Sequence, residues 1–531
     1  MLEVVIQLFV VIFLGIVSSG QSYLPVQITD KNQAEVLKAA AEHHIVFPYV
    51  VDSDGNFLSH DIHHRTRRSL ETPEIHYHVP FKNERFHLEL KPNNGFMVSG
   101  LEVEWRSGKR TRADRSCHFI GSIRNHTKSS VAISNCRGLA GLIRADQGRE
   151  FFIEPVLGVD PGGLDEGHAH VIYRRSVEEE RKTNGTEPAC GVTVEDVQGR
   201  DDFEEEAKEE VDGFYVRRRS KRAVSLMKHI EVLLVADFSL TKYYSHRDLE
   251  TYLFTIMNML SLVFKHRSIG SAIDVVLVRM IIIDTEYEEG LNITTHARKS
   301  LNNFCRWVQK INPQADSDPQ HADAAVLVTR KDICRNSYTP CHTLGLSNMD
   351  GMCTSGNECS FNQDTGFTLV YTIAHELGHN LGALHDDDYS SCSRLRNHIM
   401  ASNLVVDPSD QLWSRCSRRA MKSFLYKGWG WCLNDQPAND LEPKLPRRML
   451  PGERFDADAQ CKVFFGNKST ICNAEEEALC ATLWCMHSSG YCATKRFYGK
   501  ATGFPTLDGT PCGKTKYQWC LKGKCVNRVQ L

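Results

Sequence analysis

The chain has 531 residues, a formal net charge of −3 and an ordinary globular composition. This length exceeds that of one compact domain and predicts about three domains. The near-neutral charge favours neither nucleic acid nor a membrane surface as a partner, so we expect no nucleic-acid binding.

The first segment in chain order is the N-terminus. An apolar run from Val4 to Val17 is followed by small residues, which indicates a signal peptide over residues 1–20. Because Glu3 stands where Lys or Arg is usual, an uncleaved membrane anchor is the alternative, but the run is shorter than the roughly 18 to 20 residues of a span. We therefore expect a secreted, extracellular protein with no integral membrane segment in its mature form. Sequons for glycosylation fit this compartment and stand at Asn125, Asn184, Asn292 and Asn467.

The cysteines divide the rest of the chain and leave one residue over. There are 19 of them: eight from Cys305 to Cys432, eight from Cys461 to Cys525, and three between residues 21 and 222. Each group of eight can pair internally, as expected in a secreted protein. Cys117 can pair with Cys136, so the unpaired cysteine is Cys190.

An acidic, aromatic-poor run over residues 195–212 leads into a cluster of basic residues. Arg219, Lys221 and Arg222 form the R-x-K-R pattern that furin-type convertases cut, although a basic surface loop is the alternative. The pattern predicts a removable propeptide over residues 21–222 and a convertase as a partner. A second such pattern lies at residues 65–68, where a second cut and a basic loop both stay open.

After Arg222 the pattern becomes α/β. Apolar β-branched runs predict strands at residues 229–237, 272–284 and 322–329, and residues 249–266 read as an amphipathic helix. These belong to a predicted domain over residues 223–435. A proline-rich linker is predicted at 436–460, followed by a small loop-rich, disulfide-held unit at 461–531.

The segment that carries chemistry is TIAHELGHNLGALHDDD, residues 372–388. His375 and His379 are four residues apart and share one helix face, and Gly382 permits a turn that brings His385 to the same ion. Three protein ligands leave one position open, as in catalytic zinc sites. Three histidines on the outside of a helix would explain neither the glycine nor the spacing, so the motif predicts a catalytic Zn²⁺.

Three further residues complete the predicted site. Glu376 would accept a proton from the attacking water and pass it to the leaving amine. Met400, in HIMAS, is predicted to pack beneath the histidines as the methionine turn that accompanies this motif. The Cys190 thiolate would fill the open zinc position and keep the precursor latent until the propeptide leaves, with intermolecular pairing or a free thiol as the alternatives.

These residues resemble the ADAMTS family, secreted disintegrin-like metalloproteinases with thrombospondin motifs. Asp386 after the third histidine marks the adamalysin group of the metzincins, and LGLSNMDGMC (344–353) is similar to the family's calcium-loop region. LPGERFDADAQC (450–461) and GTPCGKTKYQWCLKGKCV resemble the two ends of its disintegrin-like domain. The resemblance implies an α/β metzincin-type protease domain with a mixed sheet and an active-site helix, between a propeptide and a disintegrin-like cysteine-rich domain.

The resemblance also implies disulfides and structural Ca²⁺. The implied pairs are Cys305 with Cys359, Cys334 with Cys341, Cys353 with Cys432, and Cys392 with Cys416. One calcium site would use Glu231, Asp323, the Cys432 carbonyl and Asp435, and a weaker one Asp332, Ile333, Cys341 and Thr343. Gln363 and His342 depart from the family's acidic residues, which predicts a weakened second cluster.

The sequence therefore predicts a secreted, latent zinc metalloendopeptidase. The resemblance implies extracellular matrix substrates such as proteoglycans or procollagens, and tissue-inhibitor-type metalloprotease inhibitors as partners. In this family a thrombospondin repeat would normally begin at the point where this sequence stops, Leu531. We therefore expect a truncated isoform, a fragment or a protease with looser targeting. The alternative is a truncated non-catalytic or decoy matrix-binding protein. The presence of His375, Glu376, His379 and His385 argues against it.

Overall fold

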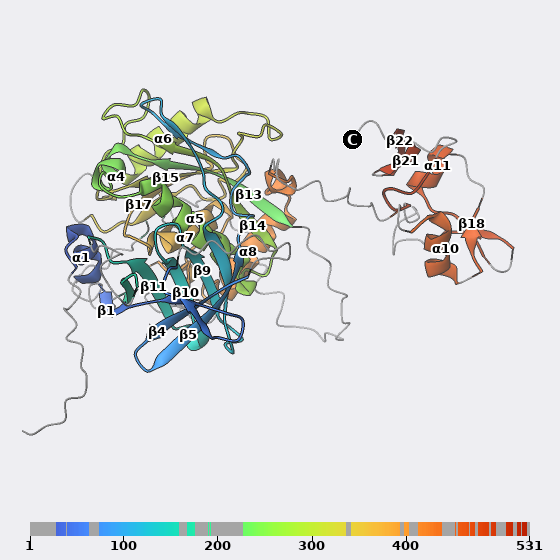
Figure 1. The fold of residues 1–531 in the computed structure, drawn as a ribbon. Coiled ribbons are helices and arrows are strands. Elements are labelled where there is room, and N and C mark those ends of the chain that lie inside the picture. Colours follow the sequence, from blue (N-terminus) through green and yellow to red (C-terminus); the bar gives the residue numbers. More distant parts are fainter. Residues whose placement is uncertain are drawn as a thin grey trace, which may run out of the picture. The chain divides into compact units, whose positions relative to one another are not determined.

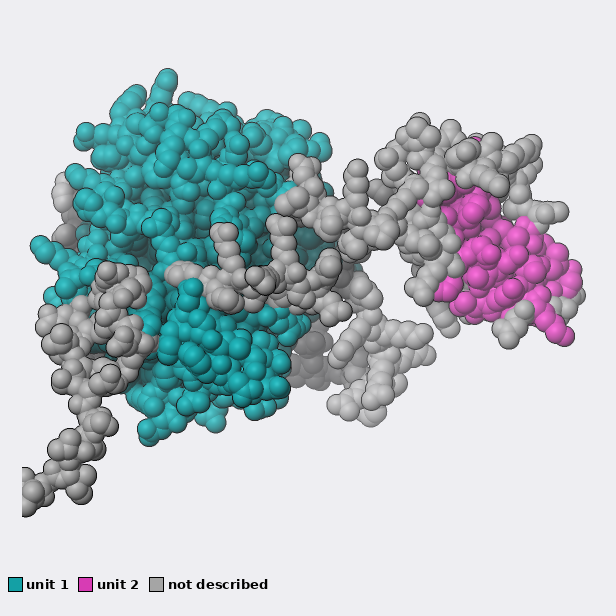
Figure 2. Space-filling view, in the orientation of Figure 1, with its two compact units in different colours: residues 1–440 teal, residues 441–531 magenta. Residues whose placement is uncertain are grey.

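The chain forms two compact units, residues 1–440 and 441–531 (Figure 1; Figure 2). The computed structural model describes residues 28–38, 40–62, 74–158, 167–175, 190, 192, 227–335, 341–392, 398–402, 412–437, 452, 455–466, 468–472, 476–487, 490–494, 506–512, 518–521 and 523–527. Across these described stretches, none of the helices has the length and apolar character needed to traverse a bilayer. The predicted signal peptide and both basic cleavage patterns lie outside the described residues.

The predicted propeptide forms an antiparallel sheet of ten strands in the order β1-β12-β11-β10-β9-β8-β5-β4-β2-β3. Helix α1 (Lys31–Lys38) precedes it, and one face of the sheet buries its own core, which includes Tyr77, Leu88 and Ile133. The strands are β1 (Ala40–Val46), β2 (Tyr49–Val51), β3 (Phe57–Ser59), β4 (Ile75–Phe81), β5 (Glu84–Pro92), β8 (His118–Ile123), β9 (Ser130–Ser134), β10 (Ala140–Arg144), β11 (Glu150–Pro155) and β12 (His170–Arg175).

The protease region forms a second, mixed sheet in the order β16-β17-β15-β13-β14-β6-β7. Its central strands β13, β14 and β15 are almost continuously buried, which explains their unbroken apolar sequence. The predicted α/β fold with a mixed sheet is therefore confirmed. The strands are β6 (Glu102–Trp105), β7 (Arg110–Arg112), β13 (Lys228–Ala236), β14 (Ile273–Ile282), β15 (Ala324–Thr329), β16 (Gly345–Ser347) and β17 (Cys359–Gln363).

Helix α5 (Leu249–Lys265) lies between the two sheets and differs from its amphipathic prediction. Asp248 caps its first turn by accepting from the Thr251 backbone N–H, at 3.1 Å. Every residue from Leu253 to Ser261 is buried, so no face of this stretch meets solvent. One side contacts β14 and helix α7 (Leu369–Asn380), and the other contacts β8, β9 and β10 of the propeptide (Figure 1). The propeptide sheet therefore covers the face that the sequence pattern assigned to water.

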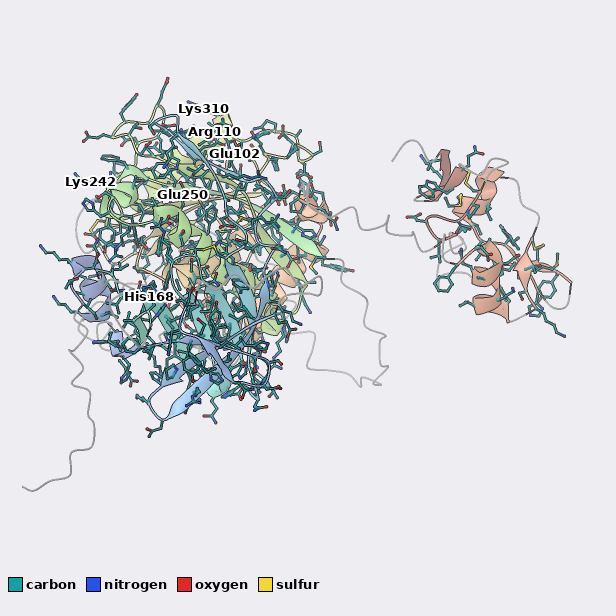
Figure 3. All side chains as sticks on the ribbon, viewed as in Figure 1. Glu102, Arg110, His168, Lys242, Glu250 and Lys310 are labelled. Atoms are coloured by element: carbon teal, nitrogen blue, oxygen red, sulfur yellow. A yellow bond between two sulfur atoms is a disulfide. The ribbon has the colours of Figure 1, made fainter. Side chains whose placement is uncertain are left out.

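Hairpin β6–β7 of the propeptide joins the protease sheet, which the sequence did not predict. β6 pairs in parallel with β14, with Val103 opposite Met280. Arg279 of β14 holds the Glu104 carboxylate through two contacts, at 2.7 and 3.1 Å. Glu250 of α5 (Figure 3) accepts from Trp105 Nε1 at 2.8 Å. Propeptide and protease thus share one sheet and one buried cluster.

The remaining protease helices are α4 (Phe238–Tyr243), α6 (Ala297–Ile311), α7 (Leu369–Asn380) and α8 (Arg415–Tyr426). The structure pairs Cys305 with Cys359, Cys334 with Cys341, Cys353 with Cys432, Cys392 with Cys416, and Cys117 with Cys136. Among the described residues, Cys190 is the free cysteine, and it is buried.

The second unit is small, and its half-cystines form much of its core. It contains α10 (Ala457–Phe465), α11 (Glu476–Ala481), a three-stranded sheet of β18 (Thr470–Ile471), β19 (Cys485–Met486) and β20 (Cys492–Ala493), and a hairpin of β21 (Gln518–Leu521) and β22 (Lys524–Asn527). Its disulfides join Cys461 with Cys485, Cys472 with Cys492, Cys480 with Cys520, and Cys512 with Cys525. Two buried clusters consist mostly of these cysteines.

The predicted linker at 436–460 is too long at its C-terminal end. Helix α10 begins at Ala457, inside the predicted linker, because Asp456 caps it by accepting from the Ala459 N–H at 2.8 Å. The sequence pattern therefore assigns Asp456 and the first residues of helix α10 to the proline-rich linker, whereas the structure places them at the start of a helix.

Candidate active site

Helix α7 (Leu369–Asn380) carries the predicted zinc motif and is buried along its whole length. It ends at Asn380, with Leu381 as the C-cap, and Gly382 then takes a φ of +83°. A Cβ at Gly382 would lie 2.6 Å from Asp350 Oδ1, so both the backbone conformation and the available space require glycine. This turn directs the chain back so that His385 reaches the histidines of the helix.

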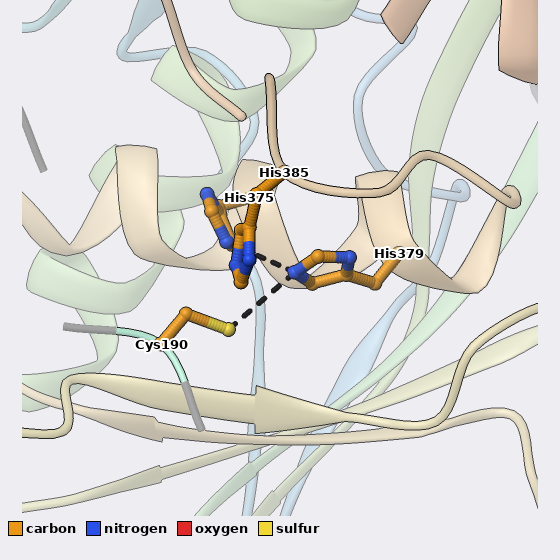
Figure 4. A group of neighbouring side chains, drawn as sticks. All are labelled: Cys190, His375, His379 and His385. Carbon is orange, nitrogen blue, oxygen red and sulfur yellow. Dashed lines mark hydrogen bonds between the residues drawn. The ribbon is translucent and has the colours of Figure 1, made fainter. Parts of the chain in front are cut away.

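The three histidines present nitrogens to one point (Figure 4). His375 Nδ1 lies 2.6 Å from the Ile399 carbonyl and His379 Nδ1 lies 2.7 Å from the Ala383 carbonyl, so each ring donates its proton there. Their Nε2 atoms therefore face each other as lone pairs, 3.0 Å apart. His385 Nε2 is buried and has no hydrogen-bond partner among the described residues.

Such a set of acceptors is stable only around a cation, and it fits zinc. Burial and the neighbouring His385 lower the pKa of His375 to about 3, and burial lowers the pKa of His379 well below its usual range. Both rings are therefore neutral near pH 7, as metal ligation requires.

Glu376 lies on the same helix and is held from the opposite strand. Ser347 Oγ on β16 is 2.7 Å from Glu376 Oε2 and 3.0 Å from the Glu376 carbonyl oxygen, both of which accept. Burial raises the pKa of Glu376 to about 7, which suits a group that takes and returns a proton near neutral pH. A Cβ at Gly345 would lie 2.4 Å from Glu376 Oε1, so the neighbouring strand position must be glycine.

Sequence reasoning missed Ser347 and Gly345. Both lie in LGLSNMDGMC, which was expected to be a calcium-loop region, whereas residues 345–347 form strand β16 beside Glu376. The sequence held a signal that these two residues act together, because residues two apart in a strand, such as Gly345 and Ser347, project from the same face.

Cys190 lies in the site itself, with a side chain only 3% exposed. Its sulfur is 3.4 Å from His379 Nε2 (Figure 4). The same sulfur is 3.4 Å from Glu376 Oε1. The Cys190 backbone forms an isolated parallel β-bridge with Gly345 of β16. Burial and the Glu376 carboxylate raise the pKa of the Cys190 thiol, and a cation in the histidine cluster would favour the thiolate.

Met400 is fully buried against helix α7. A Cβ at Gly378 would lie 2.4 Å from Met400 Sδ, so the small residue in the helix makes room for the thioether. The Met400 carbonyl accepts from the Asp386 N–H at 2.8 Å, and the carboxylate of Asp386 accepts from Ser417 Oγ at 3.0 Å. The turn that follows the third histidine is thus tied to the methionine turn.

Known proteins match this arrangement domain by domain. Residues 228–437 match the reprolysin (M12B) family of zinc metalloproteases, residues 44–124 match the reprolysin family propeptide, and residues 451–526 match ADAMTS cysteine-rich domain 2. "A disintegrin and metalloproteinase with thrombospondin motifs 12" of Mus musculus is 35% identical over 94% of this chain and 31% of its own length.

"A disintegrin and metalloproteinase with thrombospondin motifs 7" of Homo sapiens is 36% identical over 91% of this chain and 29% of its own length. The chain belongs to the ADAMTS family. It spans less than half the length of these two relatives. Among solved structures, metalloproteinase-II from Bacteroides fragilis aligns with a TM-score of 0.35 and 12% identity over 76% of this chain and 95% of its own, a likeness too weak to support a structural conclusion.

The acidic residues that the ADAMTS resemblance assigns to a first calcium site lie near one another. Glu231 on β13 and Asp323 before β15 are buried, and the Glu231 N–H donates to Asp323 Oδ2 at 2.9 Å. Burial and the carboxylates of Asp435 and Asp316 raise the pKa of Glu231 to about 8, and burial and Glu231 raise that of Asp323 to about 9. Carboxylates forced together in this way are the hard ligands that calcium selects.

Sequence reasoning missed Asp316 in this cluster. Among the described residues, Asp316 Oδ1 and Asp323 Oδ1 are buried without a hydrogen-bond partner. Asp316 and Asp323 present carboxylate oxygens within 4.8 Å of each other, beside the sulfur of Cys432, which is held in the disulfide with Cys353. The signal was weak, since Asp316 stands in a short acidic run that reads equally well as a surface loop.

The second cluster has a different character. Ile333 and Thr343 form an antiparallel bridge, and the disulfide of Cys334 and Cys341 closes the loop between them. Gln363 Nε2 donates to Asp332 Oδ1 at 3.1 Å. An amide donor thus occupies a carboxylate that a cation at this cluster would need.

Other predicted positions divide between described and undescribed residues. Asn125 and Asn292 are exposed, as glycosylation would require. Asn184, Asn467 and the processing residues Arg219, Lys221 and Arg222 lie outside the described residues.

Proposed function

We propose that this ADAMTS chain is a secreted, latent zinc metalloendopeptidase that hydrolyses extracellular matrix proteins after its propeptide is removed. The observation that carries the proposal is the meeting of three buried imidazole lone pairs, the Glu376 carboxylate and the Cys190 thiol within one site. His375, His379 and His385 would hold the zinc. When bound, zinc supplies a Lewis acid that polarises a peptide carbonyl and acidifies water.

Glu376 performs the proton transfers. Ser347 holds Oε2, which leaves Oε1 facing the position that the Cys190 sulfur fills, at 3.4 Å. Once Cys190 leaves, Oε1 can accept a proton from water in that position and later deliver it to the leaving amine. The raised pKa of about 7 makes both transfers feasible near neutral pH.

The edge of β16 supports an extended peptide as substrate. The parallel bridge between the Cys190 and Gly345 backbones supports this proposal, because main chain pairs with the edge at that point. An edge that binds main chain favours cleavage within a polypeptide. Proteoglycans and procollagens are the substrate classes that the family resemblance supports.

Latency in this proposal has two parts. Cys190 occupies the site, and the propeptide is packed into the protease through β6, Glu104 and the buried Tyr371–Glu150 contact at 2.5 Å. A furin-type convertase acting at Arg222 would release the covalent link. Calcium at Glu231, Asp323, Cys432 and Asp435 would stabilise the protease domain, and tissue-inhibitor-type proteins are proposed inhibitors.

The test is cleavage of a panel of proteoglycans, procollagens and other matrix proteins by convertase-processed protein. Glu376→Ala and a zinc chelator should each abolish cutting. If folded, zinc-loaded and propeptide-free protein cuts nothing, the protease proposal fails for this chain and a binding or decoy role replaces it.

A further inference from the structure

A second group of buried histidines lies in the propeptide sheet. His76 and His78 stand on β4 and His87 on β5, with exposures of only 8%, 6% and 9%. In the register of the two strands, His78 is opposite His87 and His76 is opposite Glu89. Because alternate residues of a strand share a face, these four side chains project from the same face of the sheet.

This face is not the one that packs the propeptide core. The intervening residues Tyr77 and Val79 fill that core. A turn covers the histidines instead: a Cβ built on Gly55 would lie 3.5 Å from His78 Nε2 and 3.5 Å from His87 Nδ1. Burying three imidazoles outside an apolar core is costly unless their nitrogens have partners.

Two of the nitrogens have the spacing of metal ligands. His76 Nδ1 lies 3.2 Å from His87 Nε2. Nitrogens bound at 2.0–2.1 Å to a tetrahedral zinc are about 3.3 Å apart. In the active site, the facing nitrogens of His375 and His379 are 3.0 Å apart. The Glu89 carboxylate offers an oxygen within 4.8 Å of a ring nitrogen of each of these two histidines.

Two of these ligand groups, His87 and Glu89, have a partner that orients them. His87 Nδ1 lies 3.1 Å from His78 Nε2, and His78 Nδ1 lies 3.2 Å from the Tyr49 hydroxyl. A proton on His87 Nδ1 leaves the Nε2 lone pair directed at His76. Arg124 Nε donates to Glu89 Oε1 at 2.6 Å, and a carboxylate has a second oxygen.

The electrostatics keep the central ring neutral. Burial and the Arg124 guanidinium lower the pKa of His87 to about 4, and burial and Arg85 lower the pKa of His78. A neutral imidazole is the form that binds a transition metal.

We infer that His76 Nδ1, His87 Nε2 and the Glu89 carboxylate form a second zinc site, located in the propeptide. Two imidazoles with one carboxylate select zinc or a similar late first-row divalent ion over calcium. The ion would cross-link β4 to β5. His78 is a positioning residue that acts through His87. This inference is independent of the proposed protease activity, since none of its residues belongs to the active site.

Zinc stoichiometry of the full-length precursor tests the site. Processing is prevented by Arg222→Ala, and bound zinc is measured by mass spectrometry after dialysis against metal-free buffer. We expect two zinc ions per chain in this protein, one in His375→Ala/His379→Ala, one in His76→Ala/His87→Ala and none when the four substitutions are combined. His43→Ala, which removes an exposed histidine of the same propeptide, should keep both ions.

The crossed design separates the two sites. One zinc per chain in the parent, lost entirely from His375→Ala/His379→Ala, overturns the propeptide site and leaves the protease proposal intact. A second zinc that persists in His76→Ala/His87→Ala also overturns it. Should that double variant fail to fold, the milder His78→Phe decides: loss of the outer partner should weaken zinc binding by roughly 10- to 100-fold, and unchanged affinity overturns the assignment.

Discussion

The two histidine clusters of the first unit differ in how the chain assembles them. In the active site, His375 and His379 stand one turn apart on a single helix, and His385 follows after a glycine turn. In the propeptide, His76 and His87 come from two strands and meet only because the strands pair in one register. A slip of one residue would separate the second pair but could not separate the first.

The clusters also differ in what completes them. The active-site cluster adjoins a carboxylate whose pKa is near neutrality and a thiol from another domain, so it can bind, react and be inhibited. The propeptide cluster adjoins the Glu89 carboxylate, which is paired with Arg124, and its other neighbours are an imidazole and a tyrosine that orient His87. Ligand geometry alone thus does not distinguish a catalytic site from a structural one.

Removal of the catalytic carboxylate should sharpen this contrast most. Glu376→Gln keeps all three histidines, so zinc content should be unchanged while kcat/KM falls by roughly 10²- to 10⁴-fold. Activity is measured on processed protein with a cleaved matrix substrate, and zinc by mass spectrometry. Loss of zinc together with activity would mean that Glu376 helps to hold the site rather than to transfer protons.

Ser347→Ala removes only the group that holds Glu376. A hydrogen bond to a charged group contributes about 1.5–3 kcal/mol, so kcat/KM should fall about 10- to 100-fold. Ser347→Thr, which keeps the hydroxyl, is the matched control and should recover much of the loss. If alanine and threonine variants are equally active, Ser347 does not position the carboxylate.

Cys190→Ser in the uncleaved precursor should unblock the active site while the propeptide stays attached. Serine is a poorer zinc ligand than a thiolate, so precursor activity should rise at least about tenfold, the effect of losing about 1.4 kcal/mol. His76→Ala leaves Cys190 in place and should keep the precursor latent. Equal activation by both substitutions would show that latency depends on propeptide stability rather than on the thiol.

The smallest expected effect is on stability and depends on pH. It comes from the buried carboxylates of Glu231 and Asp323. Burial and neighbouring carboxylates raise the pKa of Glu231 to about 8 and of Asp323 to about 9, against about 4 in an unfolded chain. Between the pKa values of the unfolded and folded states, the folded state binds more protons than the unfolded state does. Without calcium, the free energy of unfolding therefore falls as pH rises.

We expect the melting temperature of calcium-free protein to fall by at least about 3 °C from about pH 5.5 to about pH 8, the effect of about 1 kcal/mol. Calcium should remove this dependence, and Asp316→Asn should reduce it. A calcium-free protein equally stable at both pH values would rule out this carboxylate cluster as a calcium site.

Much of the active site could be predicted from the sequence because its signals are local. The four-residue spacing of His375 and His379, the glycine before His385 and the Glu next to the first histidine all lie within one short segment. The unpaired Cys190 followed from a count of cysteines within separate segments. The three buried strands of the protease sheet were equally readable from continuous apolar runs.

Other features required contacts between distant segments. Ser347 reaches Glu376 only because β16 pairs antiparallel with β17 at the edge of the sheet. Asp316 joins Glu231 and Asp435 from three separate parts of the chain. Helix α5 is buried on both sides because the propeptide supplies a second sheet that its own periodicity does not reveal.

By itself, then, the sequence determined the zinc motif, the cysteine segments and the α/β class, since helix spacing, composition and apolar runs are encoded by near neighbours. The tertiary structure alone decided that β6 extends the protease sheet, that Ser347 holds Glu376 and that His76 meets His87. Strand register and the packing of one domain on another depend on residues far apart in the chain, and no local pattern specifies them.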